Sequence, residues 1–224
     1  MLNGALSHPD LDDPNKIILG PDYIDGPDTE EYTEGVRDRN GHGTHVAGIA
    51  AAETNNGIGV AGVAWNCKLM IIQVFDAWGY GYSQSFYNGV KYAVDYYRNN
   101  PSIRVVINFS GGGSSASQVM LDAVIYAYNY GVTIVASSGN NNGPINYPAA
   151  YSSIYDNVIA VGATQYNDAR AYYSNYGYQL NVVAPGGAHD GGFPVDPGDI
   201  FSTMPNYDVV LNGPPYNVSR NYGY

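Results

Sequence analysis

Short apolar runs alternate with longer amphipathic stretches through most of this chain, and this pattern limits the possible folds more than any other feature of the sequence. Such alternation is typical of parallel strands joined by crossover helices. The strand candidates are Leu69–Phe75, Val105–Phe109, Val132–Ala136, Val158–Gly162 and Leu180–Ala184. We therefore expect an α/β fold with three layers, in which helices cover both faces of a mostly parallel sheet.

Two helices are predicted between the first three strands, each from apolar residues at helical spacing. One face of the first helix carries Val90, Ala93, Val94 and Tyr97. One face of the second carries Leu121, Val124, Ile125 and Tyr128, and Gly131 follows as a C-terminal cap. A further helix, rich in small residues, is predicted from His42 to Glu53, and residues 55–59 are typical of a turn.

The two ends of the chain lack a regular pattern. Residues 1–41 are rich in Asp, Pro, Gly and Asn and predict surface loops, and the stretches 186–199 and 217–224 are irregular as well. A chain of 224 residues with 45% hydrophobic content is long enough for one domain, whereas a second would be cramped. We expect residues 1–224 to form a single domain that is incomplete at both ends.

The charge balance excludes several classes of partner. A net charge of −11 with only nine Lys and Arg residues argues against nucleic-acid binding, which needs clustered cations. No run approaches the roughly 18 consecutive apolar residues of a membrane span, and the first residues do not form a signal-peptide pattern. Cys67 is the only cysteine, so an internal disulfide is impossible and the redox compartment stays open.

Residues that follow directly after strands are the first place to look for a site, because ligands of open α/β sheets bind outside the carboxyl ends of the strands. Ser110–Gly113 follows one strand candidate and offers backbone without side chains, which suits close approach by an extended ligand. Ser137–Asn140 follows the next. The Asn140 amide could stabilise negative charge on a carbonyl oxygen, or it could simply close a turn.

His42 lies at the start of a predicted helix. The helix dipole disfavours an imidazolium there, so a neutral imidazole that accepts a proton is plausible, provided that a carboxylate orients it. A metal pair with His45 is a weak alternative, since the His-Glu-x-x-His signature and a third ligand are missing. His45 is otherwise expected to pack under a loop.

Six segments, in the same order along the chain, resemble conserved motifs of the subtilisin-like serine proteases. The first contains the sequence Gly-His-Gly-Thr-His-Val-Ala-Gly. The segments are Asn40–Gly48, Asn56–Ala64, Val106–Ser110, Ala136–Asn140, Val158–Ala163 and Val183–Gly186. Together they cover nearly the whole chain, and six ordered motifs are far more specific than any one of them. The resemblance implies a subtilisin-like fold, a polypeptide substrate and a secreted protein.

The resemblance also implies a role for individual residues. His42 would be the general base, Asn140 the oxyanion donor, and Ser110, Gly111, Gly112 and Gly139 the backbone that contacts the substrate. Many family members carry an apolar residue where this chain has Gly111, so the wall of the specificity pocket should be more open. A structural Ca²⁺ site is also common in the family. Its matching positions here are Asp10, Asn56 and the backbone of Thr54, Ile58 and Val60.

Two parts of the family pattern are missing from the 224 residues: the Asp-Ser/Thr-Gly motif of the catalytic aspartate and the Gly-Thr-Ser-Met-Ala motif of the nucleophile. We expect a truncated domain of an active endopeptidase whose printed residues alone do not turn over substrate. Two alternatives stay open. One is a binding or scaffold protein on a decayed protease fold, and the other is a half-enzyme completed by another chain that carries the missing pieces. The partners expected besides a polypeptide substrate are an N-terminal pro-segment or such a complementary chain.

Overall fold

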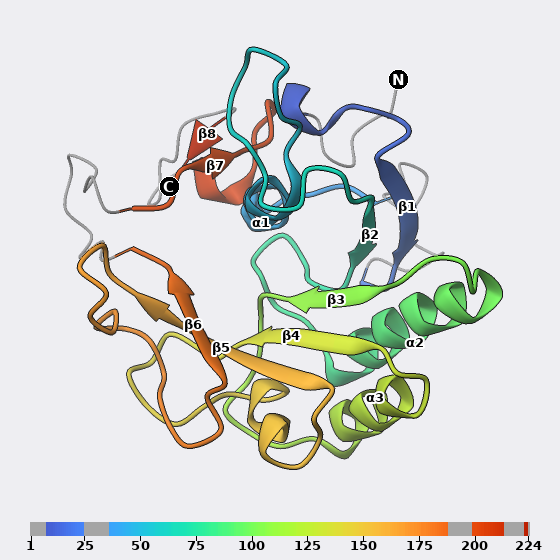
Figure 1. Cartoon of the computed structure of the whole chain (residues 1–224), viewed down its shortest axis with the longest axis vertical. Coiled ribbons are helices and arrows are strands. Elements are labelled where there is room, and N and C mark those ends of the chain that lie inside the picture. The colour runs from blue at the N-terminus through green and yellow to red at the C-terminus, as the bar shows by residue number, and fades with distance from the viewer. Residues whose placement is uncertain (1–7, 25–35, 188–198, 213–221, 224) are drawn as a thin grey trace. The chain divides into compact units, whose positions relative to one another are not determined.

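The computed structural model describes residues 8–24, 36–187, 199–212 and 222–223 (Figure 1). Contacts within the chain divide it into two compact units. Unit 1 comprises Met1–Ser85 and Phe201–Tyr224, and unit 2 comprises Phe86–Ile200. The single domain expected over the whole chain stays a prediction. Most of the irregular stretches predicted over 186–199 and 217–224 lie outside the described residues.

Unit 2 is built on a four-stranded parallel sheet with the order β3-β4-β5-β6. Its strands are β3 (Val106–Phe109), β4 (Thr133–Ser137), β5 (Val158–Thr164) and β6 (Val182–Pro185). The register pairs Val106 with Thr133, Ile134 with Val158, and Val161 with Val182. The expected α/β fold with a mostly parallel sheet is thereby confirmed, with strand bounds that differ from the predicted ones by one to two residues.

The predicted face of helix α3 (Gln118–Asn129) is confirmed only in part, at Val124. Its buried residues are Ala123, Val124 and Ala127, whereas Tyr128 is 47% exposed and rests edge-on against Tyr155. Small side chains let the helix approach its neighbours closely, and the amphipathic Tyr ring stays at the rim. The predicted face of α2 (Ser83–Asn99) is confirmed at Val90, Ala93 and Val94, which are all buried.

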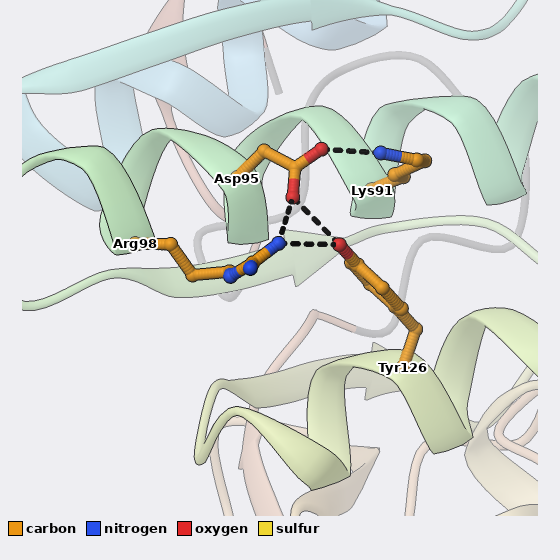
Figure 2. Close-up of polar contacts among 4 residues, drawn as sticks. All are labelled: Lys91, Asp95, Arg98 and Tyr126. Carbon is orange, nitrogen blue, oxygen red and sulfur yellow. Dashed lines mark hydrogen bonds and ion pairs between the residues drawn. The ribbon is translucent and has the colours of Figure 1, made fainter.

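A polar network on the surface joins the two helices (Figure 2). Asp95 of α2 accepts hydrogen bonds from Lys91, from Arg98 and from the Tyr126 hydroxyl of α3. The bond from Lys91 is the first cause of the lowered pKa of Asp95, and the bond from Tyr126 is the second. Because these groups are exposed, water screens their interaction, and the network contributes little to stability.

Unit 1 contains a strand that the sequence pattern did not predict. Residues 1–41 were expected to form loops, yet β1 (Ile17–Asp22) pairs in parallel with β2 (Leu69–Gln73), with Ile17 opposite Leu69. The apolar run Ile17–Leu19 is only three residues long and is followed by Gly and Pro, so it carries too weak a local signal for a strand. Its pairing with β2 and the burial of Ile17 beside Leu11 and Ala47 stabilise it.

The remaining elements of unit 1 surround helix α1 (His42–Ala51). They are the short helices η1 (Pro9–Leu11) and η4 (Val210–Asn212) and the short strands β7 (Ser202–Thr203) and β8 (Tyr222–Gly223), which pair with each other. Helix α1 ends two residues before the predicted end at Glu53.

In unit 2 the connection before β5 contains the short helix η3 (Ala149–Ser153). Among the helices of the described ranges, none is long and apolar enough to cross a membrane.

Candidate active site

A cavity of about 420 Å³ lies at the carboxyl ends of the strands of unit 2. Its lining includes three of the residues predicted to act on substrate: Ser110, Gly139 and Asn140. Ser110 follows β3, while Gly139 and Asn140 follow β4. The topology places them together because the strands are parallel neighbours, so their carboxyl ends open on the same edge of the sheet.

The backbone of Gly111 and Gly112 is held in place beside this cavity. The Ser137 hydroxyl donates a hydrogen bond of 3.3 Å to the Gly111 carbonyl. Gly113 and Tyr147 exchange two backbone hydrogen bonds of 3.0 and 2.9 Å. A Cβ at Gly112 would lie 2.6 Å from the Tyr147 carbonyl oxygen, so this position has no room for a side chain. The segment can therefore offer its backbone, but not a side chain, to a ligand.

Asn140 presents an exposed side chain to this cavity. Among the residues that the structure describes, none makes a hydrogen bond with its amide. The preceding Gly139 has a φ of +105°, a conformation that L side chains rarely adopt, and this turns the chain sharply at the end of β4. The exposed amide can donate a hydrogen bond to a carbonyl oxygen that enters the cavity.

His42 is the first residue of α1, and the carboxylate of Asp38, four residues earlier, hydrogen-bonds the backbone that leads into the helix. The N-cap Gly41, at a φ of +103°, has no side chain that could cap the helix. Asp38 does this instead, since its Oδ2 accepts hydrogen bonds of 2.7 Å from both the amide and the hydroxyl of Thr44. Its Oδ1 accepts from the amides of Asn40 (3.0 Å) and Gly41 (2.8 Å). A carboxylate at a helix N-terminus is favoured by the helix dipole.

The surroundings of His42 favour its neutral form. Desolvation by the nearby protein lowers the pKa of His42 below its ordinary value of 6.5, and the negative charge of Asp38 partly opposes this effect. The residue is exposed to water as well. A neutral imidazole at neutral pH is the form that can accept a proton.

Residues 202–211, far along the chain, pack onto the start of α1 and the turn before it. The hydroxyls of Ser202 and Thr203 each donate a hydrogen bond of 2.8 Å to carbonyls of α1, those of His45 and Thr44. The Tyr207 hydroxyl donates to the Asp38 carbonyl at 2.9 Å, and desolvation raises the pKa of Tyr207 to about 12. Backbone bonds from Val210 and Leu211 to the carbonyls of Arg39 and Asn40, both 3.0 Å, complete the contact.

Four of the five residues predicted to bind calcium form one hydrogen-bonded cluster in unit 1, and no hydrogen bond joins the fifth, Thr54, to it among the described residues. Asp10 is fully buried, and its two carboxylate oxygens accept bonds from the Asn56 side chain (2.9 Å) and the Val60 amide (2.8 Å). The Asn56 oxygen accepts from the Ile58 amide at 3.2 Å. Both contacts to the Asp10 carboxylate come from N–H groups, so this cluster would fit a hard cation only if the Asn56 amide turned by half a rotation and presented its oxygen.

The described residues do not support the weaker metal hypothesis. Within these ranges no group of three His, Cys, Asp or Glu side chains could hold a metal ion, so the pair His42 and His45 gains no third ligand there.

The structure assigns His42 to unit 1 and Asn140 to unit 2. Sequence reasoning missed Asp38, although its position four residues before a histidine that starts a helix is a signal that could have revealed it.

Comparison with known proteins agrees with these observations. The model of the subtilase family matches residues 4–220. A "Thermophilic serine proteinase" from Bacillus sp. (strain AK1) is 42% identical over 180 residues, which is 80% of this chain and 41% of that protein. The "Minor extracellular protease Epr" of Bacillus subtilis (strain 168) is 41% identical over 157 residues, which is 69% of this chain and 23% of that protein. The chain thus spans less than half the length of these two relatives.

Solved structures show the same relationship. A protease structure from Pseudoalteromonas arctica PAMC 21717 superposes with a TM-score of 0.77 at 30% sequence identity, covering 99% of this chain and 69% of that one. The match therefore extends over the strands of both units and not only over the histidine motif. From the motifs, the parallel sheet and these comparisons together, the chain belongs to the subtilase family of serine proteases.

Proposed function

We propose that the protein is a serine endopeptidase in which His42 is the general base and Asn140 donates a hydrogen bond to the oxyanion. The observation that carries this proposal is the exposed Asn140 amide, which lines the cavity at the strand ends and hydrogen-bonds no other described residue. A donor that folding leaves unpaired beside a cavity is ready to bind the charge that develops on a substrate carbonyl.

The proposed reaction is acyl transfer to a serine hydroxyl followed by hydrolysis. His42 takes the proton of the attacking hydroxyl and gives it to the departing amine, while the amide of Asn140 stabilises the tetrahedral oxyanion. The lowered pKa of His42 keeps the base neutral at neutral pH. The printed sequence contains neither the Gly-Thr-Ser motif nor the Asp-Ser/Thr-Gly motif, so the nucleophile and the orienting aspartate have no counterpart among these residues.

The substrate class is an extended polypeptide. The side-chain-free backbone of Gly111 and Gly112, held by Ser137 and Tyr147, is suited to pair with a substrate main chain. The cavity beside it would accept one substrate side chain. Since Gly111 leaves this wall without an apolar side chain, we expect broad rather than narrow selectivity. The similarity to the "Minor extracellular protease Epr" supports the proposal that this protein is secreted.

Two measurements test the proposal. The 224-residue polypeptide alone, offered a broad peptide library, should release no product, with His42→Ala as control. Turnover that His42→Ala abolishes would refute the claim that these residues lack a nucleophile. Sequencing the genomic DNA on either side of the frame then shows whether the two missing motifs are encoded there, and their absence would favour a decayed scaffold.

Kinetics test the role of Asn140 in a polypeptide that carries this chain together with both missing motifs. Asn140→Ala should lower kcat with little change in KM, because the oxyanion exists only after attack. The loss known for this donor in a subtilisin is about 100- to 1,000-fold. Asn141→Ala, which alters the exposed neighbour, is the matched control. An Asn140→Ala enzyme with unchanged kcat would exclude the proposed role.

A further inference from the structure

Asn175 is a buried asparagine whose side chain uses its whole hydrogen-bonding capacity on one loop. Only 1% of the residue is exposed. Its Oδ1 accepts from the backbone amides of Asn141 at 2.8 Å and Gly143 at 3.1 Å. Its Nδ2 donates to the Pro144 carbonyl at 2.8 Å and to Asn146 Oδ1 at 3.3 Å. A side-chain amide offers two donors and an acceptor with two lone pairs, and here all four are used.

The backbone of Asn175 holds the other side of the same loop. Its amide donates to the Gly139 carbonyl at 2.9 Å, and its own carbonyl accepts from the Ser138 hydroxyl at 3.3 Å. Two of the bonds of Asn175 therefore join it to Gly139 and to Asn141, the two residues that flank Asn140. Asn140 itself makes none of them, which leaves its side chain exposed to the cavity.

Close packing explains why this arrangement needs its particular residues. A Cβ at Gly139 would lie 2.4 Å from Asn175 Nδ2, so only glycine allows the amide to approach the chain this closely. An aspartate at 175 would keep the two acceptor interactions but lose both donors, and a leucine of the same branching would lose all four bonds. Buried polar groups left without partners are costly, so the loop depends on this amide.

We infer that Asn175 is a positioning residue for Asn140: its amide fixes residues 139–146 so that the Asn140 side chain is held beside the cavity before substrate arrives. The inference rests on the proposed function, because a fixed donor matters only if Asn140 binds the oxyanion. Donors that are held in place beforehand need no reorganisation during the reaction, which is the main source of their catalytic effect. Asn175 itself lies outside the set of residues that line the cavity.

The test uses NMR of the 224-residue chain with ¹⁵N-labelled asparagine and glycine, and needs no catalytic activity. In Asn175→Leu, amide hydrogen exchange at Asn141 and Gly143 should become at least about tenfold faster, the effect of losing one buried acceptor. The backbone amide signal of Asn140 should move toward its value in an unfolded chain. In Asn175→Asp, which keeps both acceptors, the two backbone amides should keep their protection.

Asn157→Leu is the matched control, because Asn157 is another buried asparagine of unit 2 and donates to the carbonyls of Val132 (3.1 Å) and Val124 (3.5 Å) instead. It should destabilise the unit without changing the Asn140 signal. The inference is wrong if Asn175→Leu leaves the Asn140 and Asn141 signals as in the wild type, or if Asn157→Leu alters them equally. Asn175→Ala replaces the leucine variant if that variant does not fold. Since this readout reports position, it stays valid even if Asn140→Ala leaves kcat unchanged.

Discussion

At the scale of single residues, the charge of Asp38 acts against the desolvation of His42, and the same carboxylate caps the start of α1. Desolvation lowers the pKa of His42 and Asp38 raises it, so Asp38→Asn should lower this pKa further below 6.5. NMR titration of the His42 ring measures the change. Asp76→Asn is the control, since Asp76 accepts from the amides of Trp78 and Tyr80 in another loop of unit 1 and should leave the titration unchanged.

The lowered pKa of His42 also determines how the stability of the fold depends on pH. A histidine whose folded pKa lies below its unfolded value stabilises the fold above pH 6.5, and this contribution is lost as the pH falls through the folded pKa. An Asp38→Asn titration that moves upward, or that matches the wild type, would show that Asp38 does not act on the imidazole.

Gly139 provides a second prediction at this scale. Gly139→Ala forces a Cβ onto a φ of +105° and to within 2.6 Å of both Asn175 Nδ2 and Asn146 Nδ2. We expect it to lower the unfolding free energy of unit 2 by about 2–4 kcal/mol in a urea titration, from strain and overpacking together. Gly113→Ala is the matched control, because a Cβ there meets no atom within 4 Å. Equal stability of the two variants would contradict the packing described for the loop.

The sequence predicted His42 and Asn140 because both stand in contiguous motifs at the ends of regular elements. It did not predict Asn175, whose side-chain partners lie 29 to 34 residues earlier in the chain. Side-chain bonds over such a separation leave no local pattern, since nothing in the neighbouring residues requires them. Residues that perform chemistry were therefore accessible to sequence analysis, whereas the residues that fix their position needed the fold.

At the scale of secondary structure, the sequence succeeded where apolar runs were long and failed where tertiary contacts decide. The strands of the unit 2 sheet were all predicted, because each is a run of apolar residues next to turn residues. Strand β1 was missed because only pairing with β2 makes its three apolar residues extended. The face of α3 was partly wrong because Ala123 and Ala127, not the larger residues, pack inward.

The loop after α1 provides a prediction about calcium. If the buried carboxylate of Asp10 and the loop oxygens bind Ca²⁺, excess calcium over EDTA should raise the unfolding free energy by about 2–3 kcal/mol at a concentration near a hundred times Kd. Asp10→Asn should abolish this increment. Asp12→Asn, at an exposed carboxylate beside the same short helix, should keep it. An increment that survives in Asp10→Asn would place the cation elsewhere.

At the scale of the whole molecule, apolar surface is exposed on the edge strands of the unit 2 sheet. Val106 of β3 is 65% exposed, and Val182 and Val183 of β6 are 50% and 53% exposed. These residues belong to the first and last strands in the order of the sheet. An exposed apolar edge strand is a template for pairing with another chain.

We therefore expect the 224-residue polypeptide to bind the dye ANS in its folded state and to associate as its concentration rises, through β6. Val183→Lys places a charge on this edge strand and should reduce both dye binding and concentration-dependent light scattering. Ile154→Lys is the matched control, because Ile154 is 71% exposed but lies outside the sheet, after η3. If the two lysine variants reduce association equally, the general increase in charge is responsible and β6 is not the contact. If only Val183→Lys does so, the open edge of the sheet is the surface through which these residues associate.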